Sequence, residues 1–228
     1  MINLGPILQA ITVWALPLIF AVTLHEAAHG YAALALGDDT ARRMGRLSMN
    51  PLRHVDPFGT LLLPAVLMAL GGVVFGWAKP VPVNFGRLRG GGLGMVAVAI
   101  AGPGANMAMA VLAVALTWAV PLLPSGGQVW LALNLRNALY INLLLAVFNM
   151  IPIPPLDGGR VAVGLLPRPL AMRWARLENV GLLIILVALF VLPMVGRWIG
   201  VPLDLFAWMV NGPVTWLADA ILGLAGPF

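Results

Sequence analysis

Long apolar stretches separated by short polar loops make up most of the sequence. Several of them reach or approach the roughly 20 apolar residues that a helix needs to cross a bilayer. They cover residues 7–36, 95–120, 133–153, 181–193 with its flanks, and 203–225. This pattern predicts an all-α membrane protein, a bundle of about five to six transmembrane helices. We expect one domain over residues 1–228, with a core at 1–165 and C-terminal helices at 166–228.

Residues 58–78 are also long enough to cross the membrane, but the neighbouring charges favour a different path. The basic residues after the first apolar segment are Arg42, Arg43, Arg46 and Arg53. By the positive-inside rule they place this loop in the cytoplasm and the amino terminus outside. Lys79, Arg87 and Arg89 follow residues 58–78 and favour the same side. A re-entrant hairpin with its apex at Gly71 and Gly72 would keep both sets of basic residues in the cytoplasm. A complete span is the alternative.

Composition supports a membrane environment and limits the chemistry. Hydrophobic residues make up 61% of the chain and charged residues 9%, against roughly 25% charged in an ordinary soluble domain. The chain has no cysteine, so any metal must be held by His, Asp or Glu. The net charge of +5 could suggest nucleic acid, but the basic residues fall in short loops between apolar segments. We therefore expect the lipid bilayer as a partner and no nucleic acid.

The first apolar segment contains the polar motif "TLHEAAHGYAA" at residues 23–33. In a helix, residues four apart lie about 400° around the axis, so His25 and His29 project from nearly one face. Glu26 is offset by about 100° and can reach a water on a metal held by the two imidazoles. The pattern His-Glu-x-x-His is typical of zinc peptidases, in which the glutamate is the general base.

A chance helix face and a proton relay account less well for this motif. A solvated helix face can show the same spacing by chance, but this segment is apolar and ionisable groups are costly inside a bilayer. A proton relay in a transporter could also use His25, Glu26 and His29. A metal explains why all three occur together, since it compensates their burial.

A catalytic zinc needs a third protein ligand, which must come from elsewhere in the chain. His54 lies in the proline-bounded loop "NPLRHVDPFG", and we expect it to be a loop histidine near the site. Asp157 closes "NMIPIPPLDGGR", residues 149–160, in which prolines end the preceding helix. Extended backbone at membrane depth is tolerated where it lines a cavity, so Asp157 is the better candidate. A polar turn outside the bilayer is the alternative.

The pairing of "HEAAH" with "NMIPIPPLDGG" resembles the site-2 protease family of intramembrane zinc metalloproteases. "AGPGAN" at residues 101–106 is similar to that family's small-residue motif. "NPLRHVDPFGTLLLP" and "GWAKPVPVN" resemble stretches of a compact bacterial branch without PDZ or CBS domains. The resemblance implies that His25, His29 and Asp157 bind one Zn²⁺ per chain and that Glu26 is the general base. It also implies that Asn149, and less strongly Asn106, position the substrate.

The function that follows is an intramembrane zinc metalloendopeptidase. Its expected substrates are a transmembrane protein or the remnant of a signal peptide, and its expected location is a bacterial inner membrane with the site toward the cytoplasmic half. A metal or proton transporter using His25, Glu26, His29 and Asp157 is the main alternative, and a catalytically inactive binder is another. The sequence leaves the oligomeric state open.

A segment near the motif could hold the substrate. In "AKPVPVNFG", Val81 and Val83 alternate with prolines, which suits an edge strand or another extended segment. A transmembrane substrate is helical and must unwind before hydrolysis, and an exposed edge could pair with the unwound part. An ordinary proline-rich loop is the alternative.

Overall fold

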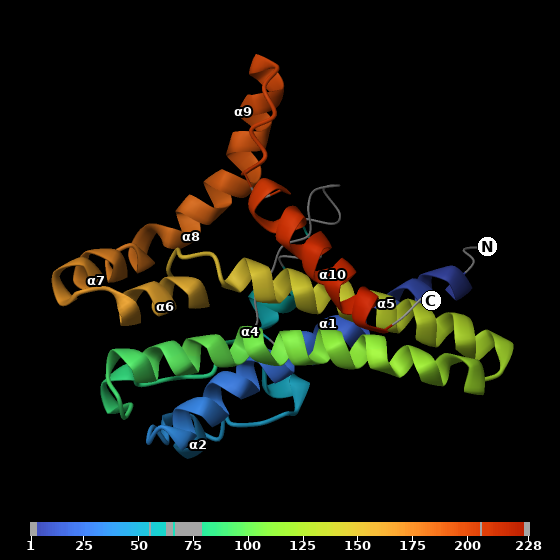
Figure 1. Cartoon of the computed structure of the whole chain (residues 1–228), viewed down its shortest axis with the longest axis horizontal. Coiled ribbons are helices and arrows are strands. Elements are labelled where there is room, and N and C mark those ends of the chain that lie inside the picture. The colour runs from blue at the N-terminus through green and yellow to red at the C-terminus, as the bar shows by residue number, and fades with distance from the viewer. Residues whose placement is uncertain (1–3, 55, 63–65, 67–78, 206, 226–228) are drawn as a thin grey trace.

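A computed structural model describes residues 4–54, 56–62, 66, 79–205 and 207–225 of the chain (Figure 1). The regular structure of these residues is entirely helical. Three helical stretches are long and apolar enough to cross a membrane, namely Gly92–Leu122, Ser125–Asn149 and Glu178–Ile199. The prediction of an all-α membrane bundle is confirmed, and the total number of crossings stays a prediction.

Three long helices pack together as the core of the bundle. They are α1 (Leu4–Ala35), α4 (Gly92–Ala115), which continues through η4 (Leu116–Leu122), and α5 (Ser125–Asn149). The start of α1 meets the start of α5, since Trp130 Nε1 donates to Thr12 Oγ1 at 3.1 Å and Asn137 Nδ2 to the Val13 carbonyl at 2.8 Å. α1 and α5 therefore run in the same direction. The end of α5, just before Asp157, therefore lies at the same end of the bundle as the end of α1.

The helix α4 runs antiparallel to both. Val98, early in α4, lies beside His29, whereas Asn106, two turns later, lies beside Ala21. Figure 1 shows α4 and α5 side by side over α1. Because α4 contacts α1, α5 and α6, it is the central helix of the bundle.

The C-terminal part of the chain adds shorter helices to this core. They are α6 (Asp157–Leu165), α7 (Arg168–Ala175), α8 (Glu178–Leu186), α9 (Leu192–Ile199) and α10 (Gly212–Ala225). The segment η5 (Val187–Val191) joins α8 to α9, and η6 (Ala207–Asn211) precedes α10. One buried cluster joins α10 to α4 and α5, formed by Ala110, Val114, Leu139, Leu143, Val210, Val214, Ala218 and Ile221.

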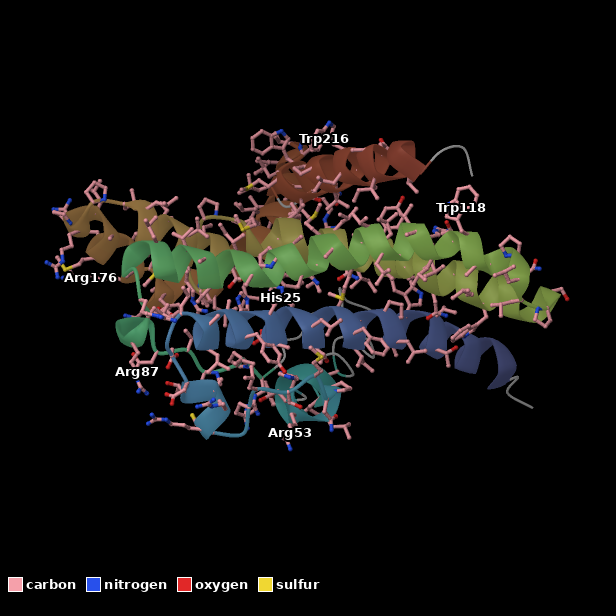
Figure 2. All side chains as sticks on the ribbon, turned by 60° about the horizontal axis from the view of Figure 1, so that its bottom comes forward. His25, Arg53, Arg87, Trp118, Arg176 and Trp216 are labelled. Atoms are coloured by element: carbon pink, nitrogen blue, oxygen red, sulfur yellow. The ribbon has the colours of Figure 1, made fainter. Side chains whose placement is uncertain are left out.

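The region between α1 and α4 holds α2 (Thr40–Arg43) and the short turns η1 (Pro51–Arg53), η2 (Pro57–Leu62) and η3 (Phe85–Arg87). The re-entrant hairpin predicted for residues 58–78, with Gly71 and Gly72 at its apex, lies mostly outside the described residues. It stays a prediction. Figure 2 shows Arg87 and Arg176 near one end of the bundle and Trp118 at the other.

Residues 79–84, which we call the strap, have no regular secondary structure and pass along α1. The Val81 N–H donates to Glu26 Oε2 at 2.7 Å, and the Asn84 N–H donates to Asp38 Oδ2 at 2.6 Å. Val81 is 7% exposed, and its side chain packs over Gly30. One carboxylate in α1 and one in the turn after α1 thus hold the backbone of the strap in place.

Asp38 is the inner of two aspartates that follow α1, and it is only 1% exposed. Its Oδ1 accepts hydrogen bonds from both the backbone N–H and the hydroxyl of Thr40. Burial raises the pKa of Asp38, but the bonds from Thr40 and Asn84 outweigh it and hold that pKa below its usual value. Asp38 is therefore an ionised anchor at neutral pH.

Asp38→Asn should release the strap. The amide has one acceptor oxygen, so either the Thr40 or the Asn84 N–H will face an NH₂ group. Losing a hydrogen bond to a charged group costs about 1.5–3 kcal/mol. The strap should therefore detach from α1 at least about tenfold more often than in the wild type. A Val81→Cys reporter, the sole thiol of this cysteine-free chain, should then react with a water-soluble maleimide correspondingly faster.

Asn84→Pro removes the backbone N–H that donates to Asp38 and should increase the labelling rate of the Val81→Cys thiol to the same extent. Asn84→Ala keeps this N–H and serves as the matched control. Because the folded pKa of Asp38 is lowered, its stabilisation is present above about pH 4 and lost as pH falls through the folded pKa. Hydrogen exchange of the strap, corrected for its intrinsic pH dependence, should show this loss in the wild type only. Equal labelling of the reporter thiol in all variants would show that Asp38 does not hold the strap.

Candidate metal centre

His25, His29 and Asp157 meet at one point inside the bundle. His25 Nε2 and His29 Nε2 are 3.0 Å apart, and each lies 3.2 Å from Asp157 Oδ2. The three residues are between 5% and 7% exposed. Figure 2 shows His25 between α1 and the helices stacked on it. The sequence predicted these three residues as ligands, and the fold brings all three together.

The geometry of α1 explains the histidine pair, and α4 completes its surroundings. One helical turn separates His25 from His29, so their rings lie 4.6 Å apart, edge to face. Gly102 of α4 lies directly against both rings. A Cβ on Gly102 would come within 2.7 Å of His25 Cε1 and would overlap the His29 ring. The absence of a side chain at this position lets α4 approach the pair.

Asn106 of α4 determines which nitrogen of His25 carries a proton. Its Nδ2 donates to the Ala21 carbonyl at 3.2 Å and to Asn142 Oδ1 at 2.8 Å. Its Oδ1 must therefore be the acceptor in the 2.6 Å contact with His25 Nδ1. The neutral imidazole of His25 consequently carries its proton on Nδ1, and its Nε2 lone pair points toward Asp157.

His29 is oriented in the same way by a backbone carbonyl. Its Nδ1 donates to the oxygen of Val98 at 2.7 Å, so its Nε2 also presents a lone pair. Asp157 Oδ2 is buried and has no hydrogen-bond partner among the described residues. Three acceptor atoms thus face one another. A proton could bridge only one pair of them, whereas a cation bound by all three satisfies each atom.

Zn²⁺ fits this donor set. Zinc binds His nitrogen at about 2.0–2.1 Å and carboxylate oxygen at about 2.0–2.2 Å, which places tetrahedral ligands about 3.3 Å apart. The observed separations of 3.0 to 3.2 Å are close to that spacing. Three protein ligands leave one position open, as in catalytic zinc sites.

The proline-rich segment before α6 delivers the carboxylate. α5 ends at Asn149, the chain turns through residues 150–156, and Asp157 is the first residue of α6. An anionic side chain is favoured at a helix N-terminus. A Cβ on Gly158 would overlap the Met150 carbonyl, so only glycine allows α6 to start this close to the end of α5.

The other predicted residues lie around this point in different ways. Glu26 is half-buried, and one of its carboxylate oxygens accepts the Val81 N–H. Asn149 is half-buried and donates to the Leu145 carbonyl of its own helix. Among the residues described, His54 is not part of the three-residue group, although it is buried and its Nε2 contacts the Ser48 carbonyl at 2.8 Å.

Sequence reasoning did not identify the partners that orient the imidazoles. The sequence predicted that Asn106 positions the substrate, which stays a prediction, and the structure shows its amide in contact with His25. Asn142 supports Asn106 and donates to the Ala138 carbonyl at 2.8 Å. The available signal was the occurrence of asparagines in otherwise apolar helices. The Val98 carbonyl gave no signal at all, since any residue has one.

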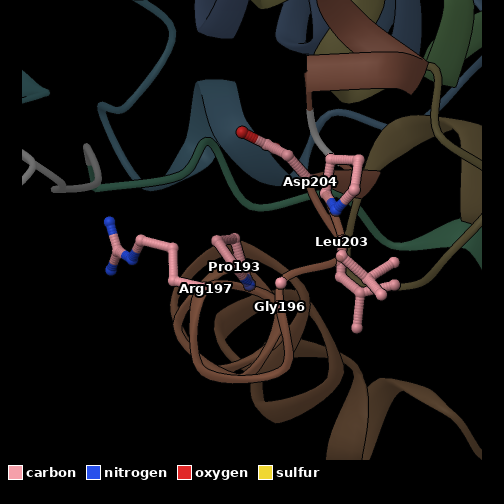
Figure 3. A pocket seen from close by; sticks show the side chains of 8 residues that line it. Pro193, Gly196, Arg197, Leu203 and Asp204 are labelled. Carbon is pink, nitrogen blue, oxygen red and sulfur yellow. The ribbon is translucent and has the colours of Figure 1, made fainter.

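A separate pocket of about 340 Å³ lies at the end of α9 (Figure 3). None of its lining residues belongs to the candidate metal-binding group. They are Pro193, Gly196, Arg197, Gly200, Val201, Pro202, Leu203 and Asp204.

Comparison with known proteins is consistent with this chemistry. The model of peptidase family M50 matches residues 128–192. "Putative zinc metalloprotease YwhC" of Bacillus subtilis (strain 168) is 40% identical over 184 residues, which cover 78% of this chain and 79% of that protein. "Putative zinc metalloprotease Rip2" of Mycolicibacterium smegmatis is 33% identical over 182 residues, covering 79% and 67%.

The protein named Rip2 in Mycobacterium tuberculosis (strain H37Rv) is 31% identical over 181 residues, covering 79% of this chain and 67% of that protein. No solved structure gives a significant match. The relative from Bacillus subtilis is similar over most of both chains, and the family model covers most of α5 and the segment that carries Asp157. The chain therefore belongs to peptidase family M50, the site-2 protease family, and is a zinc metalloprotease of the membrane.

Proposed function

We propose that His25, His29 and Asp157 are the zinc ligands of an intramembrane endopeptidase and that Glu26 is its general base. One observation carries this proposal: two imidazole nitrogens and a carboxylate oxygen, all buried, face one another as acceptors. Asp157 Oδ2 has no hydrogen-bond partner within the described structure. The transporter alternative has no comparable support, since the rest of the described core offers no second ionisable cluster.

A bound zinc ion supplies Lewis acidity to the scissile carbonyl and to the attacking water. Glu26 takes the proton from that water and passes it to the leaving amine nitrogen. One Glu26 oxygen accepts the Val81 N–H, so the other oxygen would be the one that takes this proton. Asn106 holds the His25 ring in place. The amide of Asn149 would have to leave the Leu145 carbonyl before it could bind a substrate.

The substrates we propose are transmembrane segments of other proteins, including remnants of signal peptides. The position of the three ligands between membrane helices supports this, because a soluble peptide would not reach them. A transmembrane helix bonds its own carbonyls internally and must unwind before hydrolysis. The irregular strap beside Glu26 has a backbone that could pair with the unwound part.

We further propose a bacterial inner membrane as the location, with the site toward the cytoplasmic half. The basic residues after α1 and before α4 support this orientation by the positive-inside rule. His29 lies six residues before the end of α1 at Ala35, roughly 9 Å at 1.5 Å per residue.

Purified wild-type protein should contain about one zinc per chain, and Asp157→Ala should lose most of it, because two imidazoles without the carboxylate hold zinc much more weakly. Elemental analysis of protein in mild detergent provides the measurement. Glu178→Gln removes a surface carboxylate that lies near Arg160 and should keep the zinc. Unchanged zinc in Asp157→Ala would exclude Asp157 as a ligand.

Glu26→Gln should abolish proteolysis while zinc content stays unchanged. The glutamine can still accept the Val81 N–H but cannot take a proton, and general-base catalysis contributes about 10²- to 10⁴-fold. A suitable assay follows cleavage of a fluorescent single-span peptide with a Gly-Pro pair in its span, reconstituted with the enzyme in liposomes. Activity within a few-fold of wild type would rule Glu26 out as the base.

Asn106→Leu should weaken zinc binding about 10- to 100-fold, the usual effect of losing an outer partner of a ligating histidine. Asn106→Asp keeps an acceptor for His25 Nδ1 and should lose less affinity. Competition with a zinc chelator measures both variants independently of proteolysis. If Asn106→Leu and wild type release zinc at the same chelator concentration, the amide does not support the ligand.

A further inference from the structure

Most acidic side chains of the chain have a partner within the structure. In the described part, seven of the eight acidic residues are accounted for: six contact an N–H, a hydroxyl or an arginine, and Asp157 belongs to the candidate metal-binding group. They are Glu26, Asp38, Asp39, Asp56, Asp157, Glu178 and Asp204. The eighth, Asp219 in α10, is exposed and makes neither a hydrogen bond nor an ion pair with any described residue.

Arg136 is a basic residue that also lacks a partner among the described residues and, unlike most of the other arginines, lies within a candidate membrane-spanning stretch. It lies in α5 and is exposed, again with no hydrogen-bond or ion-pair partner in the described structure. The three membrane-spanning stretches contain one other arginine, Arg197, near the end of its span. Arg136 lies roughly 16 Å from Ser125 and 20 Å from Asn149 at 1.5 Å per residue. It is therefore close to the middle of its span.

The two charged residues lie beside the same buried cluster. α10 packs along α5 through the cluster that contains Leu139, Leu143 and Ala218, and Figure 1 shows α10 crossing α5. Arg136 is one turn before Leu139, and Asp219 follows Ala218 directly. An exposed hydroxyl lies one turn from each charge: Tyr140 on α5 and Thr215 on α10.

An unpaired charge near the centre of a bilayer is costly, and such residues almost always pair with one another or face a polar interior. Apart from Asp219, every acidic side chain of the described structure either has a partner or belongs to the candidate metal-binding group. Residues 63–65 and 67–78, which lie outside the description, contain no Asp or Glu. An acidic side chain that pairs with Arg136 must therefore come from outside this copy of the chain or be Asp219 after a rearrangement.

We propose that α5 and α10 form an interface with a second copy of this chain, in which Arg136 of each copy pairs with Asp219 of the other. A two-fold axis makes both pairs at once, since the same surface serves on each side. The neighbouring hydroxyls of Tyr140 and Thr215 can then satisfy the remaining donors and acceptors. This interface lies apart from the metal centre and does not depend on the proposed function.

The experiment is charge complementation between copies, with chains per particle counted by single-molecule photobleaching in lipid nanodiscs. We expect two chains for the wild type and one for Arg136→Glu or Asp219→Arg alone, because each variant opposes like charges. An equal mixture of the two variants should return to two chains. Zinc per chain should be unchanged in all samples, which separates this test from that of the metal site.

Three results overturn the proposal. The first is a single chain per particle for the wild type, and the second is paired chains for Arg136→Glu. The third is a mixture that stays single, which would favour a pair within one chain or an anionic lipid on Arg136.

Disulfide trapping gives a second test that survives poor folding of a charge variant. The chain has no cysteine, so an Arg136→Cys copy and an Asp219→Cys copy, with different tags, each carry one thiol. Oxidation in the membrane should give at least tenfold more cross-linked dimer from this pair than from a control pair of Arg136→Cys and Leu183→Cys copies. Leu183 is exposed on α8, away from the proposed surface. Equal yields with both partners would overturn the interface.

Discussion

The arrangement of this protein depends on three buried atoms that all accept hydrogen bonds and none of which can donate one. His25 Nε2, His29 Nε2 and Asp157 Oδ2 lie within 3.2 Å of one another. In water such a group would simply spread apart. Inside a helical bundle the surrounding contacts prevent this, and a bound cation is the compensation that the geometry allows. The direct approach of α4 at Gly102 and the tight turn before α6 both serve to hold these atoms together.

Amide hydrogen bonds connect the helices on which these atoms are placed. Asn106 links α4 to α1 and α5, and Asn137 links α5 to α1. Lipid offers helices little hydrophobic reason to associate, so small residues and polar side chains give the specificity. The same asparagines therefore hold the bundle and set the imidazole orientation, and a loss of packing would also disturb the metal site.

Most charged side chains lie in the polar regions between the long helices or bond to backbone groups. Arg42, Arg43, Arg46 and Arg53 lie in the polar region after α1, where Arg46 and Arg53 bond to backbone carbonyls. Asp38 and Glu26 use their negative charge on backbone N–H groups of the strap. The general base we propose is thus positioned by a segment remote in sequence. Arg136 and Asp219 do not follow this pattern, which is why they indicate a surface that meets another molecule.

The sequence by itself determined the membrane class, the helical pattern and the two histidines on one face, because helical geometry is local and a spacing of four residues fixes a shared face. It also singled out Asp157 through the prolines and glycines around it. The tertiary structure decided what no local pattern encodes: that α1 and α5 run parallel, that Asn106 holds His25 while Asn149 bonds its own helix, and that Val81 reaches Glu26. Apolar helix faces look alike in sequence, so only packing selects which of them meet.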